Sequence, residues 1–108
     1  MGISKKHTSF GELLRSLREE AGQTLKTVAE YIEMDTSLLA KIERNERQPT
    51  KQIVKQVAEY FQVDEKKLLL EFLSDRIAFQ IIEENANMEI LKVAEEKVRY
   101  FKTIKDGE

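Results

Sequence analysis

Apolar side chains recur every three or four residues along most of the chain, which is the spacing of amphipathic helices. Residues that start or stop helices stand between these stretches. No stretch alternates apolar and polar residues as a half-buried strand does. The pattern therefore predicts an all-α protein, with five helices followed by a C-terminal helical hairpin.

The first helix is expected over residues 9–20. Ser9 and Glu12 form the pattern of a capping box, in which each side chain satisfies a backbone amide at the start of the helix. Gly22 tolerates a positive φ and is expected to end this helix. Thr24 can cap a second, short helix.

A break at residues 33–35 separates the second helix from a third, expected at about 36–44. Asp35 is a suitable N-cap, and Asn45 stands just past the end, where asparagine substitutes for glycine. Two apolar residues of this helix are expected to face the core: Leu39 and Ile42.

The remaining helices follow a loop at residues 48–50. A fourth helix comes directly after it, and Asp64 is expected to cap a fifth over 65–73. The pattern changes after Ser74 and Asp75. Two amphipathic stretches separated by a plausible turn then predict a helical hairpin, with helices at about 75–84 and 88–104.

Composition narrows the class of protein. The chain has 108 residues, one histidine and no cysteine, which excludes disulfides and makes a metal site improbable. No membrane span and no secretory signal are visible in the sequence, so a cytoplasmic protein is expected. The net charge is −2, but residues 1–55 hold ten Lys/Arg against eight Asp/Glu, and residues 56–108 hold eight against twelve. The basic surplus therefore lies in the half that contains the third helix.

Two short helices joined by a tight break, the second with polar residues on its outer face, are typical of a helix-turn-helix that enters the major groove of DNA. Ser37 and Lys41 lie on one ridge of the third helix, beside Thr36. A lysine can donate to guanine, and Ser and Thr hydroxyls can pair with several base edges. Further polar residues could hold phosphates on the flank: Arg44, Arg47, Thr50 and Lys51.

The stretch from Phe10 to Leu70 resembles the lambda-repressor-like, or XRE, family of DNA-binding domains. The resemblance depends on Leu-Arg-Glu-Glu before Gly22, Lys-Ile-Glu-Arg-Asn at residues 41–45, Pro49-Thr50, and Phe-Gln-Val-Asp at residues 61–64. It implies a five-helix domain that binds double-stranded DNA. It also implies that the start and outer face of the third helix read bases, through Thr36, Ser37 and Lys41, with Leu38 near the DNA backbone.

The resemblance further implies an ion pair between Arg18 and Glu43, which would tie the first helix to the third and orient Arg44. The sequence departs from the family at two positions. Leu25 replaces a frequent glutamine, so no DNA contact is assigned there. Glu33 replaces the glycine of the turn, so either Glu33 accepts a positive φ at a cost of about 1 kcal/mol or the turn differs slightly.

The sequence leaves two interpretations of the hairpin open. It could fold back and enlarge the core of the first domain, or it could form the interface of a homodimer that reads two half-sites. A lone hairpin of this size buries little, so it must pack on something. We favour the dimer, because a helix-turn-helix monomer contacts few base pairs and two-fold pairs are the commonest oligomers. The expected interface residues are Ile81, Met88, Leu91, Ala94, Val98 and Phe101.

No catalytic constellation is visible, so no enzymatic activity and no cofactor are expected. His7 lies in an expected flexible arm over residues 1–8, which could touch DNA but which we read as a frayed terminus. The DNA-binding domain is expected over 9–73 and the dimerisation hairpin over 74–108. The function predicted is that of a DNA-binding transcriptional regulator, either a repressor or an autoregulator. The alternative is an antitoxin or another protein-interaction module whose partner is a protein.

Overall fold

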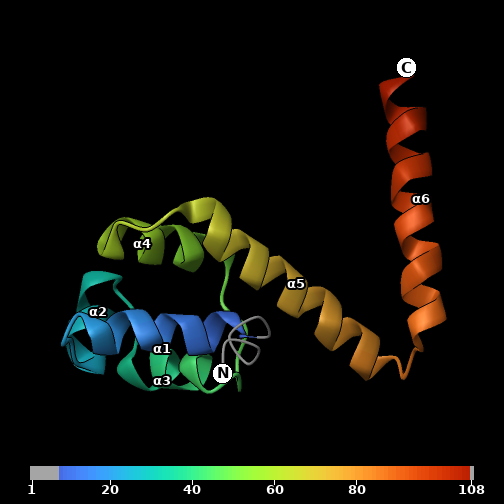
Figure 1. The fold of residues 1–108 in the computed structure, drawn as a ribbon. Helices are drawn as coiled ribbons and strands as arrows, with labels where there is room; N and C mark the ends of the chain where they lie inside the picture. The colour runs from blue at the N-terminus through green and yellow to red at the C-terminus, as the bar shows by residue number, and fades with distance from the viewer. Residues whose placement is uncertain (1–7, 108) are drawn as a thin grey trace. The chain divides into compact units, whose positions relative to one another are not determined.

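A computed structural model describes residues 8–107, and Figure 1 shows the helices along this part of the chain. It contains six helices and no strand within that range, which confirms the all-α prediction: α1 (Phe10–Glu20), α2 (Leu25–Tyr31), α3 (Thr36–Glu43), α4 (Lys51–Phe61), α5 (Glu65–Glu83) and α6 (Met88–Asp106). The arm expected over residues 1–8 lies outside the described residues, apart from Thr8. The chain forms two compact units, of which the first ends at Arg76 and the second begins at Ile77.

The ends of α1 have the predicted caps. The Ser9 hydroxyl accepts from the Glu12 amide at 3.1 Å, and the Glu12 carboxylate accepts from the Ser9 amide at 3.0 Å. Gly22 has a φ of 67°. The amide of Gln23 reaches back to the Arg18 carbonyl at 3.0 Å, so a carbonyl at the end of α1 is satisfied by the left-handed turn.

The turn between α2 and α3 keeps a left-handed residue at its first position. Glu33 has a φ of 56°, so this side chain occupies the conformation that glycine adopts most easily. The cost is about 1–2 kcal/mol for a residue with a Cβ. At the other end of α3, Asn45 has a φ of 64°, and the Glu46 amide bonds the Lys41 carbonyl at 2.8 Å. Asn45 therefore ends α3 as predicted.

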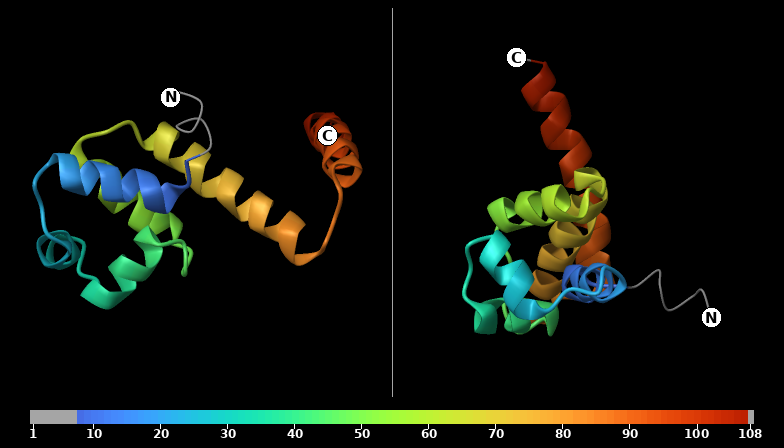
Figure 2. Two further views of the ribbon diagram at one scale, coloured as in Figure 1. Left: turned by 60° about the horizontal axis from the view of Figure 1, so that its bottom comes forward. Right: turned by 90° about the vertical axis from the view of Figure 1, so that its left-hand side faces the viewer.

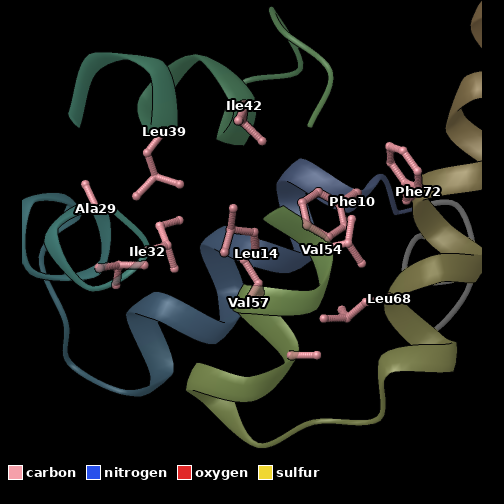
Figure 3. Close-up of a cluster of buried hydrophobic side chains, with 12 residues drawn as sticks. Phe10, Leu14, Ala29, Ile32, Leu39, Ile42, Val54, Val57, Leu68 and Phe72 are labelled. Atoms are coloured by element: carbon pink, nitrogen blue, oxygen red, sulfur yellow. The ribbon is translucent and has the colours of Figure 1, made fainter. Parts of the chain in front are cut away.

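Figure 3 draws the hydrophobic core of the first unit, whose buried side chains come from α1, α2, α3, α4 and α5. Leu39 and Ile42 of α3 point inward as predicted and are 0% and 1% exposed. Burial of such side chains contributes about 1.5–3 kcal/mol each. The remaining buried apolar residues are Phe10, Leu14, Val28, Ala29, Ile32, Val54, Val57, Ala58, Leu68 and Phe72.

The predicted break between helices at 65–73 and 75–84 is wrong, because α5 runs without interruption from Glu65 to Glu83. Ser74 and Asp75 were expected to interrupt it, but both side chains have partners that leave the helix intact. The Ser74 hydroxyl donates to the Glu71 carbonyl at 3.2 Å. The Asp75 carboxylate accepts from the Phe10 amide at 2.8 Å and so satisfies the first turn of α1. The predicted hairpin is therefore formed by the end of α5 together with α6.

The second unit contains the end of α5, a turn and α6. Asn85 has a φ of 53°, and the Asn87 side chain caps α6 by accepting from the Ile90 amide at 3.2 Å. The turn predicted at residues 85–87 is thus present. No residue of α6 is buried. Among the described residues, no helix is both long enough and apolar enough to cross a bilayer.

Candidate nucleic-acid interface

Helix α3 lies at one edge of the first unit in the views of Figure 1 and Figure 2, directly after α2 in the chain. Its inner face is held by Leu39 and Ile42 in the core. The side chains of Thr36, Ser37 and Lys41 are all exposed. The structure therefore places the three expected base-reading residues together on the outer face of one helix.

An ion pair fixes α3 against α1. Arg18 donates through Nε to Glu43 Oε2 at 2.7 Å and through a second nitrogen to Oε1 at 3.0 Å. The two side chains are only 13% and 4% exposed. Arg18 also donates to the Gln23 carbonyl at 2.9 Å, and the carboxylate of Glu43 raises the pKa of Arg18 above its ordinary value. The two-pronged geometry sets the angle as well as the distance between the helices.

Gly11 permits the close approach of α1 to the end of α3. A Cβ built on Gly11 would lie 2.2 Å from the backbone oxygen of Ile42 and 2.8 Å from the side-chain oxygen of Asn45. Neither the backbone oxygen nor the capping residue can move away without shifting α3. Gly11 lies between the capping residues Ser9 and Glu12, and nothing in the local pattern assigns it a contact with α3. The available signal was a glycine inside a helical pattern, which indicates a packing constraint.

Two more polar contacts hold the region around α2, and sequence reasoning missed both. Gln56 of α4 donates to the Ile32 carbonyl at 3.3 Å, at the start of the turn before α3. The Tyr60 hydroxyl bonds the Gln23 side chain at 2.7 Å. These contacts join residues 24 and 37 positions apart, so no local pattern could have shown them.

The first turn of α3 carries a hydrogen bond between two exposed side chains. The Ser37 hydroxyl donates to the Asp35 carboxylate, while that carboxylate makes no capping hydrogen bond to the helix backbone. The Ser37 hydroxyl holds the pKa of Asp35 below its usual value, and the positive charge of Lys41 acts in the same direction. Asp35 is therefore ionised at neutral pH, next to a residue expected to read a base.

The residues expected to hold phosphates differ in their surroundings. Arg47 and Lys51 are exposed, and Arg44 is exposed but bonds Glu46 at 2.8 Å. The Thr50 hydroxyl caps α4 by accepting from the Ile53 amide at 3.2 Å, an arrangement that leaves its proton free to donate. Leu38 is half-buried and packs against the core.

The residues expected at a dimer interface belong to the second unit. Ile81 is half-buried, whereas the other five are exposed: Met88, Leu91, Ala94, Val98 and Phe101. A shallow groove in this unit is lined by Ile77, Met88, Leu91, Ala94 and Val98, with Lys92 and Glu95 also lining it. Among the described residues, no group of three or more His, Cys, Asp or Glu side chains could hold a metal ion.

Comparison with known families agrees with this geometry. The model of the helix-turn-helix domain family matches residues 9–69, which is more than half of the chain. The chain belongs to this helix-turn-helix domain family. Its fold is that of the lambda-repressor-like, or XRE, regulators, as the resemblance implied. No curated protein matches the sequence.

Solved structures share this fold. The restriction-modification controller protein C.AhdI of Aeromonas hydrophila is 27% identical, over 55% of this chain and 89% of its own, with a TM-score of 0.52. The clp gene regulator ClgR of Corynebacterium glutamicum is 24% identical, over 82% of this chain and 88% of its own, with a TM-score of 0.53. SinR protein in its complex with SinI protein is 21% identical, over 87% of this chain and 98% of its own, with a TM-score of 0.52.

Proposed function

We propose that this helix-turn-helix protein is a sequence-specific, double-stranded DNA-binding transcriptional regulator that acts as a homodimer. The observation that carries the proposal is the placement of α3, which is locked by its buried face and by the Arg18–Glu43 pair while its outer face stays exposed. A rigid helix that presents polar residues at the edge of a small domain fits the major groove. The likeness to a restriction-modification controller protein supports the same role.

The residues of α3 and of the start of α4 have separate roles in this proposal. Thr36, Ser37 and Lys41 contact base edges, because they share the outer face of α3. Exposed groups at the end of α3 and the start of α4 position the domain on the phosphates, with Leu38 beside the DNA backbone: Arg44, Arg47, Thr50 and Lys51. Binding alone performs this function, so it needs neither catalysis nor a cofactor. Such a regulator acts in the cytoplasm as a repressor or autoregulator.

The second unit supplies the dimer contact in this proposal. Leu91, Ala94, Val98 and Phe101 are spaced three and four residues apart, as in the seam between two packed helices. Val98 and Phe101 are 52% and 60% exposed in the single chain. Apolar residues arranged along one helix in this way favour association with another helix.

A second copy of this chain fits the groove by charge as well. Lys92 and Glu95 both line it, three residues apart on α6. In a two-fold pair of antiparallel helices whose axis passes between residues 92 and 95, Lys92 of one copy faces Glu95 of the other, and the reverse pair forms by symmetry. In that register the groove is complementary to itself. A dimer would also present two α3 helices to two half-sites, about 10 base pairs apart.

Selection of binding sites from a randomised duplex library tests the proposal. We expect the wild type to select a two-fold-symmetric site at both low and moderate salt. The variant Ser37→Ala/Lys41→Ala should lose or relax that site. The control Ser16→Ala/Lys67→Ala changes the same residue types at exposed positions of α1 and α5, and it should select the wild-type site.

Two outcomes of this selection experiment would contradict the proposal. If no motif emerges, and binding by all three proteins falls equally as salt rises, the affinity is attraction to phosphates alone and the proposal is wrong. If the chain selects no site and stays monomeric at micromolar concentration, the apolar surface of α6 serves a different protein. That result would favour the antitoxin or protein-interaction alternative.

A further inference from the structure

Asp35 and Ser37 form a pair of exposed side chains at the first turn of α3. The Ser37 hydroxyl donates its proton to the Asp35 carboxylate. The Asp35 side chain makes no capping hydrogen bond to the backbone amides of α3, unlike Ser9, Thr24, Thr50 and Asn87 before their own helices. The Ser37 hydroxyl is the main partner of the Asp35 carboxylate, and the backbone amides of Ser37 and Leu38 interact with it more weakly.

The chemistry of the pair sets what it can offer to a ligand. A serine hydroxyl has one proton and two lone pairs, and an ionised carboxylate has only acceptor sites. Because the proton of Ser37 points to Asp35, the outward side of Ser37 presents lone pairs. The pair is thus a double acceptor on the outer face of α3, where a lone serine could either donate or accept.

We propose that Asp35 sets the polarity of base reading at Ser37, so that the pair accepts a hydrogen bond from the exocyclic amine of adenine or cytosine in the major groove. This inference rests on the proposed function and names the chemical group read at one of its positions. The N6 amine of adenine and the N4 amine of cytosine are the hydrogen-bond donors on base edges there. The acceptors of guanine and thymine would face a second acceptor and are rejected.

Lys41 gives α3 the complementary chemistry one turn further along. Its ammonium group offers donors only, so it suits the O6 and N7 acceptors of guanine. The positive charge of Lys41 also favours the ionised form of Asp35. Along one ridge, the helix therefore presents acceptors at its start and donors a turn later.

The Asp35 carboxylate favours one kind of base but weakens binding to DNA in general, because it places a negative charge near the phosphates. Removal of that charge should raise affinity for any duplex. Asp35→Asn should also free the proton of Ser37, because the side-chain amide that it introduces has donors as well as an acceptor. This variant is therefore expected to bind more tightly and to discriminate less, a combination that a merely structural cap does not produce.

The experiment uses base analogues in the duplex that the wild type selects. The base pair whose preference weakens in Ser37→Ala is taken as the pair that Ser37 contacts. Its adenine or cytosine is then replaced by an analogue that lacks the exocyclic amine, and in a second duplex its purine is replaced by the 7-deaza analogue, which lacks the N7 acceptor. Binding is measured for the wild type, Ser37→Ala and Asp35→Asn.

We expect loss of the amine to weaken wild-type binding about three- to tenfold, the range of one hydrogen bond. The same change should have no further effect on Ser37→Ala and a smaller effect on Asp35→Asn. The 7-deaza analogue should leave wild-type binding unchanged. Asp64→Asn is the matched control, since Asp64 is an exposed carboxylate at the start of α5 that accepts from the Lys66 amide at 3.0 Å. It should behave as the wild type with both analogues.

The outcomes separate this inference from the proposed function. If the amine can be removed without effect, or if the 7-deaza analogue weakens binding instead, the inference is wrong while sequence-specific binding stands. The same holds if Ser37→Ala alters the preference at no base pair. If the wild type selects no site at all, the proposed function fails and the inference fails with it.

Discussion

The two units of the chain differ in whether they bury their apolar side chains. In the first unit, twelve hydrophobic residues from α1 to α5 are buried in one cluster. In the second unit, α6 carries apolar residues along most of its length and buries none of them. The same spacing of three and four residues produces both sets of helices. The spacing therefore predicts an apolar face, but it does not say whether the chain itself covers that face.

Because of this difference, the two units depend on different contacts for their stability. The first unit has a core and a buried ion pair of its own, so its stability should depend on its own residues. The second unit buries no residue of α6, and we expect two helices of this size to need packing against something else. A second row on α6, formed by Ile90, Val93, Tyr100 and Ile104, widens its apolar surface beyond a single seam. This width is what a bundle of several helices would use.

The largest expected effect is the loss of the buried pair in the first unit. Arg18→Ala would leave Glu43 without its partner at 4% side-chain exposure and should lower the free energy of unfolding by about 3–5 kcal/mol. Chemical denaturation followed by circular dichroism measures this loss in the free energy of unfolding. Arg15→Ala is the matched control, because the Arg15–Glu19 pair on the same helix is more than half exposed and should contribute no more than about 1 kcal/mol. Equal losses in both variants would contradict this account of α1 and α3.

The next effect concerns the second unit alone. Val98→Asp should weaken self-association on the order of 100-fold, because the dimer would bury a carboxylate without a partner. Analytical ultracentrifugation over a range of concentrations measures the change. Thr103→Asp adds the same charge to an exposed position among the polar residues of α6 and should leave association intact. The unfolding of the first unit should persist in both variants, and its loss in Val98→Asp would show that the units are not separable.

A smaller loss is expected where α1 meets α3. Gly11→Ala should lower the free energy of unfolding by about 1–3 kcal/mol, because its Cβ would overlap the Ile42 carbonyl and push α3 outward. DNA binding by the folded variant should fall as well, since α3 carries the base contacts of the proposed function. Ser16→Ala, at an exposed position of the same helix, should change stability by less than about 0.5 kcal/mol. A stabilised Gly11→Ala would mean that helix propensity outweighs the close approach.

The smallest effect concerns Asp75, which caps α1 from α5. Burial raises the pKa of Asp75 above its usual value, and the charge of Glu12 adds to the rise, although the Phe10 amide opposes it. The folded state therefore holds this proton more tightly, and the ionised form costs stability above that pKa. Asp75→Asn should raise stability at neutral pH by less than about 1 kcal/mol, since its amide oxygen can still accept from Phe10.

The way in which the stability difference between Asp75→Asn and the wild type changes with pH tests whether the charge of Asp75 causes it. As the pH falls through the carboxyl range, wild-type Asp75 becomes protonated and its cost disappears. The advantage of Asp75→Asn should therefore shrink as the pH falls and vanish below about pH 4, the ordinary carboxyl range, as thermal unfolding at several pH values would show. An advantage that is constant with pH would point to packing rather than charge. Glu71 faces the same region, and burial together with the charge of Asp75 raises the pKa of Glu71 as well.

Local patterns in the sequence determined the helices, their caps and the family to which the chain belongs. Capping residues act within three or four positions, so Ser9, Gly22 and Asn45 could be read without knowledge of the fold. The inward orientation of Leu39 and Ile42 followed from helical spacing for the same reason. The exposed outer face of α3, which carries the candidate base contacts, followed from that orientation.

Only the tertiary structure decided features that depend on partners distant in the chain. Ser74 and Asp75 looked like a break, but the Asp75 carboxylate meets the Phe10 amide 65 positions away, and the helix continues. Gly11 stands inside an ordinary helical pattern, but its missing Cβ lets the end of α3 approach. Periodicity records which face of a helix is apolar, whereas a contact between distant residues exists only once the chain has folded and brought their atoms within bonding distance.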